Sequence, residues 1–213
     1  MLLRETFAAG AFQCNCTVLA CEDTRCAVVI DPGGEVDRIR DIVRQHDLVV
    51  TAIIHTHAHL DHIYCTRDVK EAHGGDICLH ADDRPLYDAF AVQASMFGWQ
   101  PRATLPVDRW IADGDRIDLG NYGAAVVHTP GHTPGSVCFA VDGDEGPVLF
   151  AGDTLFRRSI GRTDLPGGDG RAIERSIRER LYTRDPDTVV VCGHGPETTI
   201  GDESLQNPFV SIR

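Results

Sequence analysis

The feature that most constrains this chain is a short passage in which an apolar run ends in a cluster of imidazoles and carboxylates. The run Val49–Ile54 is rich in β-branched residues and reads as a buried strand, and the pattern His57-x-His59-x-Asp61-His62 follows it. A shuffled chain of this composition would show that pattern with a probability of roughly 0.002. The passage therefore indicates a metal site at the end of a strand.

The spacing within the cluster suggests how the side chains divide. In an extended segment, residues two apart point the same way, so the imidazoles of His57 and His59 can reach one metal ion. If the chain turns into a helix near Asp61, the adjacent side chains of Asp61 and His62 point elsewhere and can address a second ion. The pattern is therefore compatible with two neighbouring metals.

Three later strand-like runs end in further candidate ligands, His132, Asp153 and His194. Glycines beside each of them let the backbone turn sharply and approach closely, as expected where several loops converge on one ion. Imidazole and carboxylate ligands without thiolate suit zinc, iron or manganese and leave room for water, which is typical of catalytic sites. We expect two divalent metal ions, with zinc as the first choice and iron or manganese as alternatives.

The order of apolar runs and helical patterns predicts a layered α/β fold. Segments 12–30 and 105–150 read as antiparallel meanders, which favours two sheets between helices over one parallel doubly wound sheet. With 213 residues, the chain is expected to form a single domain, 1–213. Helical patterns cover 36–43 and 173–181. The expected strands are Thr17–Leu19, Ala27–Ile30, Val49–Ile54, Ala124–Val127, Val137–Val141, Val148–Phe150 and Thr188–Val191.

Composition argues against several classes of partner. The formal net charge of −12 repels nucleic-acid phosphates and anionic lipid head groups, so neither nucleic acid nor membrane is expected as a partner. No apolar run approaches the ~18 residues needed to cross a bilayer, and Glu5 stands where a signal peptide would be apolar. The eight cysteines include no CxxC pair. We therefore expect a cytoplasmic protein with mostly reduced thiols.

Further passages resemble the metallo-β-lactamase fold hydrolases, and more narrowly the small glyoxalase II-like hydroxyacylglutathione hydrolases. This resemblance spans almost the whole chain and implies an αββα sandwich of two mixed sheets flanked by helices. The passages are Phe12-Gln-Cys-Asn-Cys, Asp31-Pro-Gly, Gly131-His-Thr-Pro-Gly-Ser, Gly152-Asp-Thr-Leu-Phe, 159–169, and 193–201 followed by Asn207-Pro-Phe.

The resemblance also implies how the ligands are shared. Asp31 is expected to brace the metal loop through hydrogen bonds, a role in which orientation matters more than charge. The alternative for Asp31 is a plain turn residue. The implied ligand sets are His57, His59 and His132 on one metal, Asp61, His62 and His194 on the other, and Asp153 as the bridge.

Two departures from the resembled family bear on substrate recognition. Larger glyoxalase II enzymes carry a C-terminal helical domain that contacts glutathione, and we expect this chain to lack one. After the equivalent of Asp61-His62, the family usually has Gly-Gly-Asn, whereas here Ile63 is followed by Tyr64-Cys65-Thr66. The ligands are retained, but the pocket beside them is expected to differ in shape.

The activity implied by the resemblance is hydrolysis of a thioester such as S-D-lactoylglutathione to a hydroxy acid and a thiol. Metal coordination lowers the pKa of water from 15.7 towards ~7 and so supplies hydroxide at neutral pH. Asp61 is the candidate catalytic residue because it would hold its metal and orient that hydroxide. Arg162 is a candidate contact for a substrate carboxylate, or else it structures its own loop through Asp164.

Other functions stay open at this point. Sulfur dioxygenases of the same fold resemble the chain at Gly161-Arg-Thr-Asp and would place His57, His132 and Asp153 around one iron. A noncatalytic metal-binding module is disfavoured because seven ligands exceed what a scaffold needs, and β-lactam hydrolysis is expected less than thioester hydrolysis. The expected partner is a small-molecule thioester, and the oligomeric state is left open.

Overall fold

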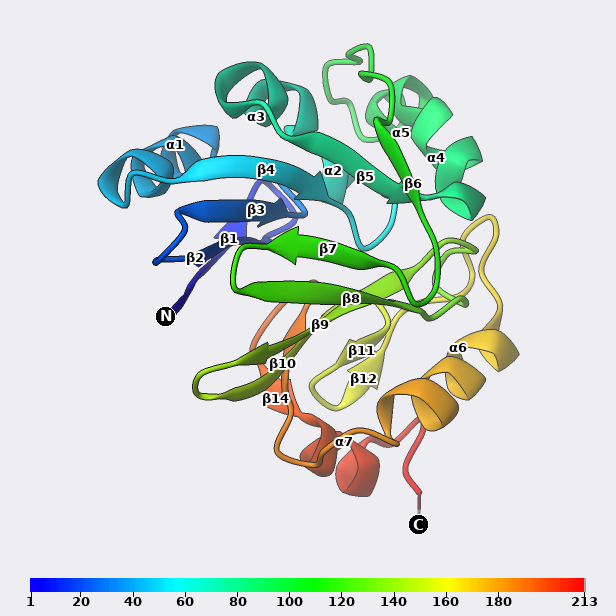
Figure 1. Cartoon of the computed structure of the whole chain (residues 1–213). Helices are drawn as coiled ribbons and strands as arrows, with labels where there is room; N and C mark the ends of the chain where they lie inside the picture. The colour runs from blue at the N-terminus through cyan, green and yellow to red at the C-terminus, as the bar shows by residue number, and fades with distance from the viewer. Residues whose placement is uncertain (213) are drawn as a thin grey trace.

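Two six-stranded sheets lie face to face in the middle of the molecule, and helices cover both outer faces (Figure 1). The computed structural model describes residues 1–212 of the chain. The α/β sandwich of two mixed sheets expected from the sequence is confirmed. That residues 1–213 form one domain stays a prediction.

The first sheet has the order β1-β2-β3-β4-β5-β6. Its first three strands run antiparallel, as the meander predicted for 12–30 requires, and β3 to β6 are parallel. The sequence reading did not include the first and the last two of these strands. The bounds are β1 Leu2–Ala9, β2 Cys14–Cys21, β3 Cys26–Ile30, β4 Val49–Ile54, β5 Asp76–His80 and β6 Arg109–Ile111.

The second sheet has the order β14-β13-β10-β9-β8-β7. Strands β7 to β10 form the antiparallel meander expected within 105–150, and β13 adds parallel to β10. A small hairpin, β11 Leu155–Phe156 with β12 Ser159–Ile160, follows β10. The sheet strands are β7 Arg116–Leu119, β8 Tyr122–His128, β9 Val137–Gly143, β10 Gly146–Gly152, β13 Val189–Cys192 and β14 Thr198–Thr199.

Helices pack their apolar sides on the outer faces of the two sheets. Helix α1 is the amphipathic segment expected after Gly34, and it buries Ile39 and Val43 against the first sheet. Ile173 and Leu181 do the same against the second sheet. The helical bounds are α1 Val36–Gln45, α2 Leu60–Ile63, α3 Thr66–His73, η1 Ala81–Asp83, α4 Arg84–Asp88, α5 Phe90–Met96, α6 Gly170–Ser176, the π-helical η2 Ile177–Leu181 and α7 Ile200–Gln206.

The main core lies between the sheets, where side chains of both inner faces meet. Leu19 and Ile54 of the first sheet share one buried cluster with Phe139 and Val126 of the second. Burying each large side chain of this kind contributes about 1.5–3 kcal/mol relative to exposure. The sheets are therefore a rigid base for the loops at their ends.

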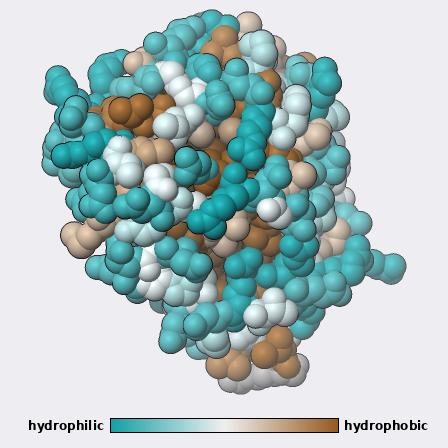
Figure 2. All heavy atoms as spheres, in the orientation of Figure 1, coloured by the Kyte–Doolittle hydropathy of each residue, from teal (hydrophilic) through white to brown (hydrophobic). Residues whose placement is uncertain are grey.

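On the face shown in Figure 2, hydrophilic side chains predominate and apolar patches lie between them. Among the described residues, none of the helices combines the length and apolar character needed to cross a bilayer. All eight cysteines lie within the described chain, and their thiols are free. That the thiols are reduced in the cell stays a prediction.

Candidate metal centre

The seven candidate ligands come from four loops that converge at one end of the sandwich. The loop after β4 carries His57 and His59, and α2 begins directly after it and carries the next two candidates. The remaining three follow β8, β10 and β13. Because the carboxyl ends of these strands meet at the same edge, side chains up to 137 residues apart become neighbours; they are His57, His59, Asp61, His62, His132, Asp153 and His194.

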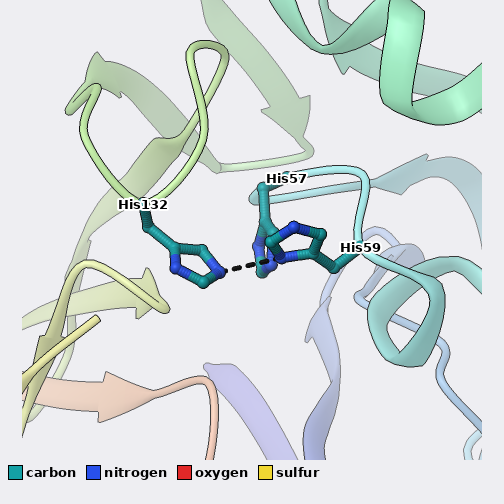
Figure 3. A group of neighbouring side chains, drawn as sticks. All are labelled: His57, His59 and His132. Atoms are coloured by element: carbon teal, nitrogen blue, oxygen red, sulfur yellow. Dashed lines mark hydrogen bonds between the residues drawn. The ribbon is translucent and has the colours of Figure 1, made fainter. Parts of the chain in front are cut away.

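His57, His59 and His132 form the first group (Figure 3). One ligand atom of each lies within 4.8 Å of the others. His59 Nδ1 is 2.9 Å from His132 Nε2, and the ring of His57 meets both of the other rings edge to face. Nitrogens this close converge on one point, as the alternating spacing of His57 and His59 predicts.

Asp61, His62 and His194 form the second group, and one ligand atom of each lies within the same limit. His194 Nε2 is 3.1 Å from Asp61 Oδ2 and 3.3 Å from His62 Nε2. The short helix α2 carries Asp61 and His62, and both side chains face this second group. The ring of His62 also lies 4.1 Å from the ring of His57, so the two groups adjoin at His62.

Asp153 lies between the two groups. Its Oδ1 is 3.3 Å from His62 Nε2, and its Oδ2 is 3.5 Å from His132 Nε2. One carboxylate oxygen therefore faces each group, which is the geometry that a bridging ligand needs.

The donor set fits metal ions on two observations. Asp153 Oδ1 and His57 Nε2 are buried without a hydrogen-bond partner in the described chain, a state that is costly unless a cation completes them. The outward nitrogens of two other imidazoles are held by backbone carbonyls, His132 Nδ1 by Arg162 at 2.8 Å and His194 Nδ1 by Phe12 at 3.0 Å. Such contacts fix the ring so that Nε2 presents its lone pair to the centre.

Two imidazoles of the first group are in the neutral form that a metal ligand needs. Burial, together with neighbouring imidazoles, lowers the pKa of His59 to about 4 and that of His57 well below its usual range. Both rings are therefore neutral at pH 7. Despite its burial, the pKa of Asp153 is held below the usual value by His62 and the other imidazoles, so that carboxylate is ionised.

Asp31 braces the metal loop through three hydrogen bonds. Its Oδ1 accepts from the Thr56 backbone N–H at 2.8 Å, while its Oδ2 accepts from the Thr56 hydroxyl at 2.6 Å and lies 3.0 Å from His62 Nδ1. The side chain is buried. These contacts match the bracing role expected for Asp31. Its backbone also has the positive φ of a turn residue, 49°, but a plain turn residue would not make these side-chain contacts.

Asp83 is a site residue that the sequence reading missed. Its fully buried carboxylate accepts from the Ala58 N–H at 2.9 Å, the Gly135 N–H and the Thr133 hydroxyl. It therefore joins the loop of His57 to the loop of His132 across the two sheets. Burial raises the pKa of this carboxyl even though all three donors oppose that shift.

Asn15 is a second residue with an unforeseen role. It lies in the passage Phe12-Gln-Cys-Asn-Cys, which contributed to the family resemblance but had no assigned function. Its amide donates to the carbonyls of Cys192 and Gly195 at 2.9 and 2.8 Å, and these carbonyls flank His194 in sequence. Asn15 thus holds the last ligand loop against the β1–β2 turn.

Arg162 contacts the centre through its backbone and an acidic residue through its side chain. The guanidinium donates from Nε and Nη2 to the two carboxylate oxygens of Asp164, each at 2.7 Å, and lowers the pKa of Asp164 to about 2. This pair is the loop-structuring contact considered from the sequence. A contact between Arg162 and substrate stays a prediction.

One further group of candidate ligands, His80, Asp82 and His128, lies away from the centre. The two imidazoles stack with ring centroids 4.2 Å apart and planes only 14° apart. Lone pairs of imidazole lie in the ring plane, so two parallel stacked rings cannot direct them at the same ion. This group is therefore a stacked pair rather than a metal site in this conformation.

Comparisons with known proteins agree with this geometry. Residues 9–194 match the model of the metallo-beta-lactamase superfamily. The chain is 36% identical to hydroxyacylglutathione hydrolase GloC of Haemophilus influenzae, over 98% of both chains. Among solved structures it resembles BLEG-1 B3 metallo-beta-lactamase, with 36% identity, a TM-score of 0.88 and coverage of 98% and 99% of the two chains.

A second solved structure bears on the metals. TTHA1623 in a di-iron-bound form is 38% identical, with a TM-score of 0.84 and coverage of 98% of this chain and 100% of that one. The match to the family model covers far more than half of the sequence and includes every candidate ligand. The chain therefore belongs to the metallo-beta-lactamase superfamily.

Proposed function

We propose that this protein is a metal-dependent hydrolase that cleaves thioesters such as S-D-lactoylglutathione into a hydroxy acid and a thiol. The observation that carries the proposal is the convergence of two donor groups on either side of Asp153, with oxygen Oδ1 of that residue lacking a partner in the described chain. The GloC relative supports the choice of substrate class.

The residues of the chain define the reaction geometry. Two bound divalent ions would supply hydroxide at neutral pH and polarise the substrate carbonyl. Asp61 is 20% exposed at its side chain and Asp153 is 14% exposed, so these carboxylates border the open side of the centre where substrate can enter. Asp61 would orient the attacking hydroxide through its carboxylate.

The leaving group explains why a thioester suits this site. A thiol of pKa near ~8.5 departs as thiolate, whereas an amide nitrogen needs a proton donor in the transition state. The imidazoles of His57 and His59 are neutral and would be occupied as ligands, so they do not serve as that donor. A substrate with a good leaving group matches these residues.

The alternative is a mononuclear-iron dioxygenase that oxidises persulfides with His57, His132 and Asp153 as ligands. The similar structure TTHA1623, solved in a di-iron-bound form, is the observation that favours iron. The gathering of Asp61, His62 and His194 into a second group supports the dinuclear hydrolase instead.

The proposal is tested by measuring hydrolysis of S-D-lactoylglutathione by the purified protein while counting metal ions per chain. We expect turnover with two metals bound, and a loss on the order of a hundredfold or more in His57→Ala, because even outer-sphere partners of a metal ligand change activity 10–100-fold. His46→Ala, at the C-terminal cap of α1 and outside every group of candidate ligands, is the matched control and should keep full activity.

Three outcomes would contradict the proposal. Persulfide-dependent oxygen uptake with one iron per chain and no thioester cleavage would establish the alternative. Faster hydrolysis of a cephalosporin than of any thioester would place the chain with its β-lactamase relative. Equal activity of His57→Ala and wild type would show that the centre is not the site of reaction.

A further inference from the structure

Four aromatic side chains form a continuous wall on the protein surface; they are Phe12, Tyr64, Phe97 and Trp99. The ring of Phe12 stacks on Trp99 at 5.2 Å and meets Phe97 edge to face at 5.1 Å, and Tyr64 meets Trp99 at 4.8 Å. Phe12 is 42% exposed and Phe97 55% exposed. Exposed aromatic rings in mutual contact are typical of binding surfaces.

This aromatic wall starts one hydrogen bond away from the metal centre. The backbone carbonyl of Phe12 accepts from His194 Nδ1 at 3.0 Å, so the turn that carries the Phe12 ring also fixes a candidate ligand. Tyr64 is two residues beyond His62, at the end of α2. It stands where the resembled family usually has glycine, which could not supply a ring.

The other half of the wall is tied to the metal loop by Gln93. Its Oε1 accepts from the Leu60 N–H at 3.0 Å, and its Nε2 donates to the Ala58 carbonyl at 3.1 Å. Gln93 belongs to α5, which leads directly into Phe97 and Trp99. The position of these rings is therefore set relative to His59 by a side chain that hydrogen-bonds the backbone of Ala58 and Leu60, the two residues that flank it.

An open apolar groove of about 360 Å³ lies beside the wall, and Tyr64 and Trp99 line it. Gly10, Ala11 and Gly33 also line the groove, and their lack of large side chains keeps the space open. A cavity of about 150 Å³ is large enough to hold benzene. This groove can therefore take a phenyl ring or a branched aliphatic group.

The two ends of the centre differ in polarity. His194 is held by the turn that bears the aromatic wall, whereas His132 is held by the carbonyl of Arg162, in a loop with an exposed guanidinium. A thioester lying across the centre has its acyl group and its thiol carrier at opposite ends. The Arg162 guanidinium is paired with Asp164 but keeps further N–H donors for the polar groups of a peptide-like thiol, which leaves the acyl group for the wall.

Resting on the proposed thioester hydrolysis, we propose that the aromatic wall binds the acyl group and makes the enzyme selective for thioesters with aromatic or branched apolar acyl groups. The small, polar lactoyl group would leave the rings of Phe12 and Trp99 exposed. Burying a side chain the size of phenyl contributes enough free energy to change kcat/KM by about tenfold or more.

The test compares S-mandeloylglutathione with S-D-lactoylglutathione, which share the thiol and the 2-hydroxyacyl core and differ by phenyl against methyl. Wild type should prefer the mandeloyl substrate by about tenfold in kcat/KM. Phe12→Ala should lower kcat/KM for the mandeloyl substrate several-fold more than it lowers kcat/KM for the lactoyl substrate. Phe209→Ala, another exposed aromatic, is the matched control and should leave the preference unchanged.

A binding measurement gives an independent readout. The chain has two tryptophans, so Trp110→Phe leaves Trp99 as the sole indole. S-phenacylglutathione is a thioether that is not hydrolysed, and it should change Trp99 fluorescence on binding. The dissociation constant should rise several-fold when Phe12→Ala is added to the Trp110→Phe protein.

The outcomes separate this inference from the proposed function. If wild type cleaves the lactoyl substrate at least as well as the mandeloyl one, acyl selectivity is refuted while thioester hydrolysis stands. If Phe12→Ala slows both substrates equally, Phe12 acts only through His194 and the inference fails. The mandeloyl and lactoyl groups can also be attached to N-acetylcysteamine in place of glutathione. If the preference for the mandeloyl group is lost with this thiol, the wall binds the thiol carrier instead. If no thioester is cleaved, both proposals fail together.

Discussion

At the scale of single residues, the centre depends on groups that aim the ligands as much as on the ligands themselves. Asp31 fixes His62, the carbonyl of Arg162 fixes His132, and the carbonyl of Phe12 fixes His194. In each case the contact is made to Nδ1, which leaves Nε2 for the metal. The orientation of an imidazole is thus set before any ion binds.

Replacing Asp31 by asparagine tests this principle. The amide nitrogen of Asp31→Asn would donate to His62 Nδ1, which forces the proton onto Nε2 and removes its lone pair. Asparagine tolerates the positive φ at this position, so the backbone is preserved. We expect metal affinity to fall about 10–100-fold in titrations against a competing chelator.

The exposed Asp37→Asn on α1 controls for loss of one negative charge. Unchanged affinity in Asp31→Asn would show that the hydrogen bond from His62 does not set the ligand.

Position 193 must be glycine because the candidate metal centre leaves no room there for a side chain. A Cβ at this position would lie 2.0 Å from Asp153 Oδ1 and 3.0 Å from His62 Cε1. Gly193→Ala should therefore displace the bridging carboxylate and reduce the number of metal ions retained after dialysis, as counted by elemental analysis.

Gly170→Ala is the matched control, because its Cβ meets only Thr163 Oγ1 at an ordinary 3.4 Å. If Gly193→Ala retained two metals per chain, the close approach to Asp153 would have no consequence for binding.

At the scale of elements, the site is held together by contacts between loops that are far apart in sequence. Asp83 follows β5, yet it binds the loop after β4 and the loop after β8. The Asp83 side chain has no contact with solvent, so these three hydrogen bonds replace the water that an exposed carboxylate would bind. One side chain therefore couples the two ligand loops contributed by different sheets.

Asp83→Asn should weaken this coupling. An amide can accept from some of the three donors, but its own N–H₂ would face a donor and leave a buried group unsatisfied, at a cost of about 1–3 kcal/mol. We expect the free energy of unfolding of the metal-free protein in urea to fall by that amount. Asp82→Asn, at a more exposed neighbouring carboxylate, should change it little, and equal stability of both variants would contradict the coupling.

The predictability of these elements from the sequence differs for physical reasons. Strands such as β4 and β9 are strongly apolar and were placed correctly, and the ligands were found because metal-binding side chains stand out at strand ends. Strand β1 was missed because it is an edge strand with polar residues, and β5 because Asp76 and His80 at its ends leave only a short apolar stretch between them. Asp83 and Asn15 act on backbone atoms of distant loops, a relationship that local sequence patterns do not contain.

At the scale of the whole molecule, two sheets place four loops at one edge and concentrate acidic and imidazole ligands there. The chain has a formal net charge of −12, so bound cations would relieve local repulsion between the carboxylates of the centre. Metal binding at this candidate centre would therefore be coupled to folding, because the unfolded chain cannot assemble ligands that lie up to 137 residues apart.

Metal removal should consequently lower the melting temperature. A ligand present at a hundred times its dissociation constant stabilises the fold by about 2.7 kcal/mol, which corresponds to a shift of about 5–10 °C for a chain of this length. Differential scanning calorimetry before and after dialysis against a chelator measures the shift. Identical melting temperatures would mean that the folded chain binds no metal tightly.

The most direct measurement is a crystal structure of the metal-loaded protein with anomalous diffraction recorded at the absorption edge of the bound metal. The account predicts two anomalous peaks on either side of Asp153, one bordered by His57, His59 and His132 and the other by Asp61, His62 and His194. Peaks elsewhere on the molecule, or an ordered centre that carries no peak after incubation with zinc, iron or manganese, would contradict it.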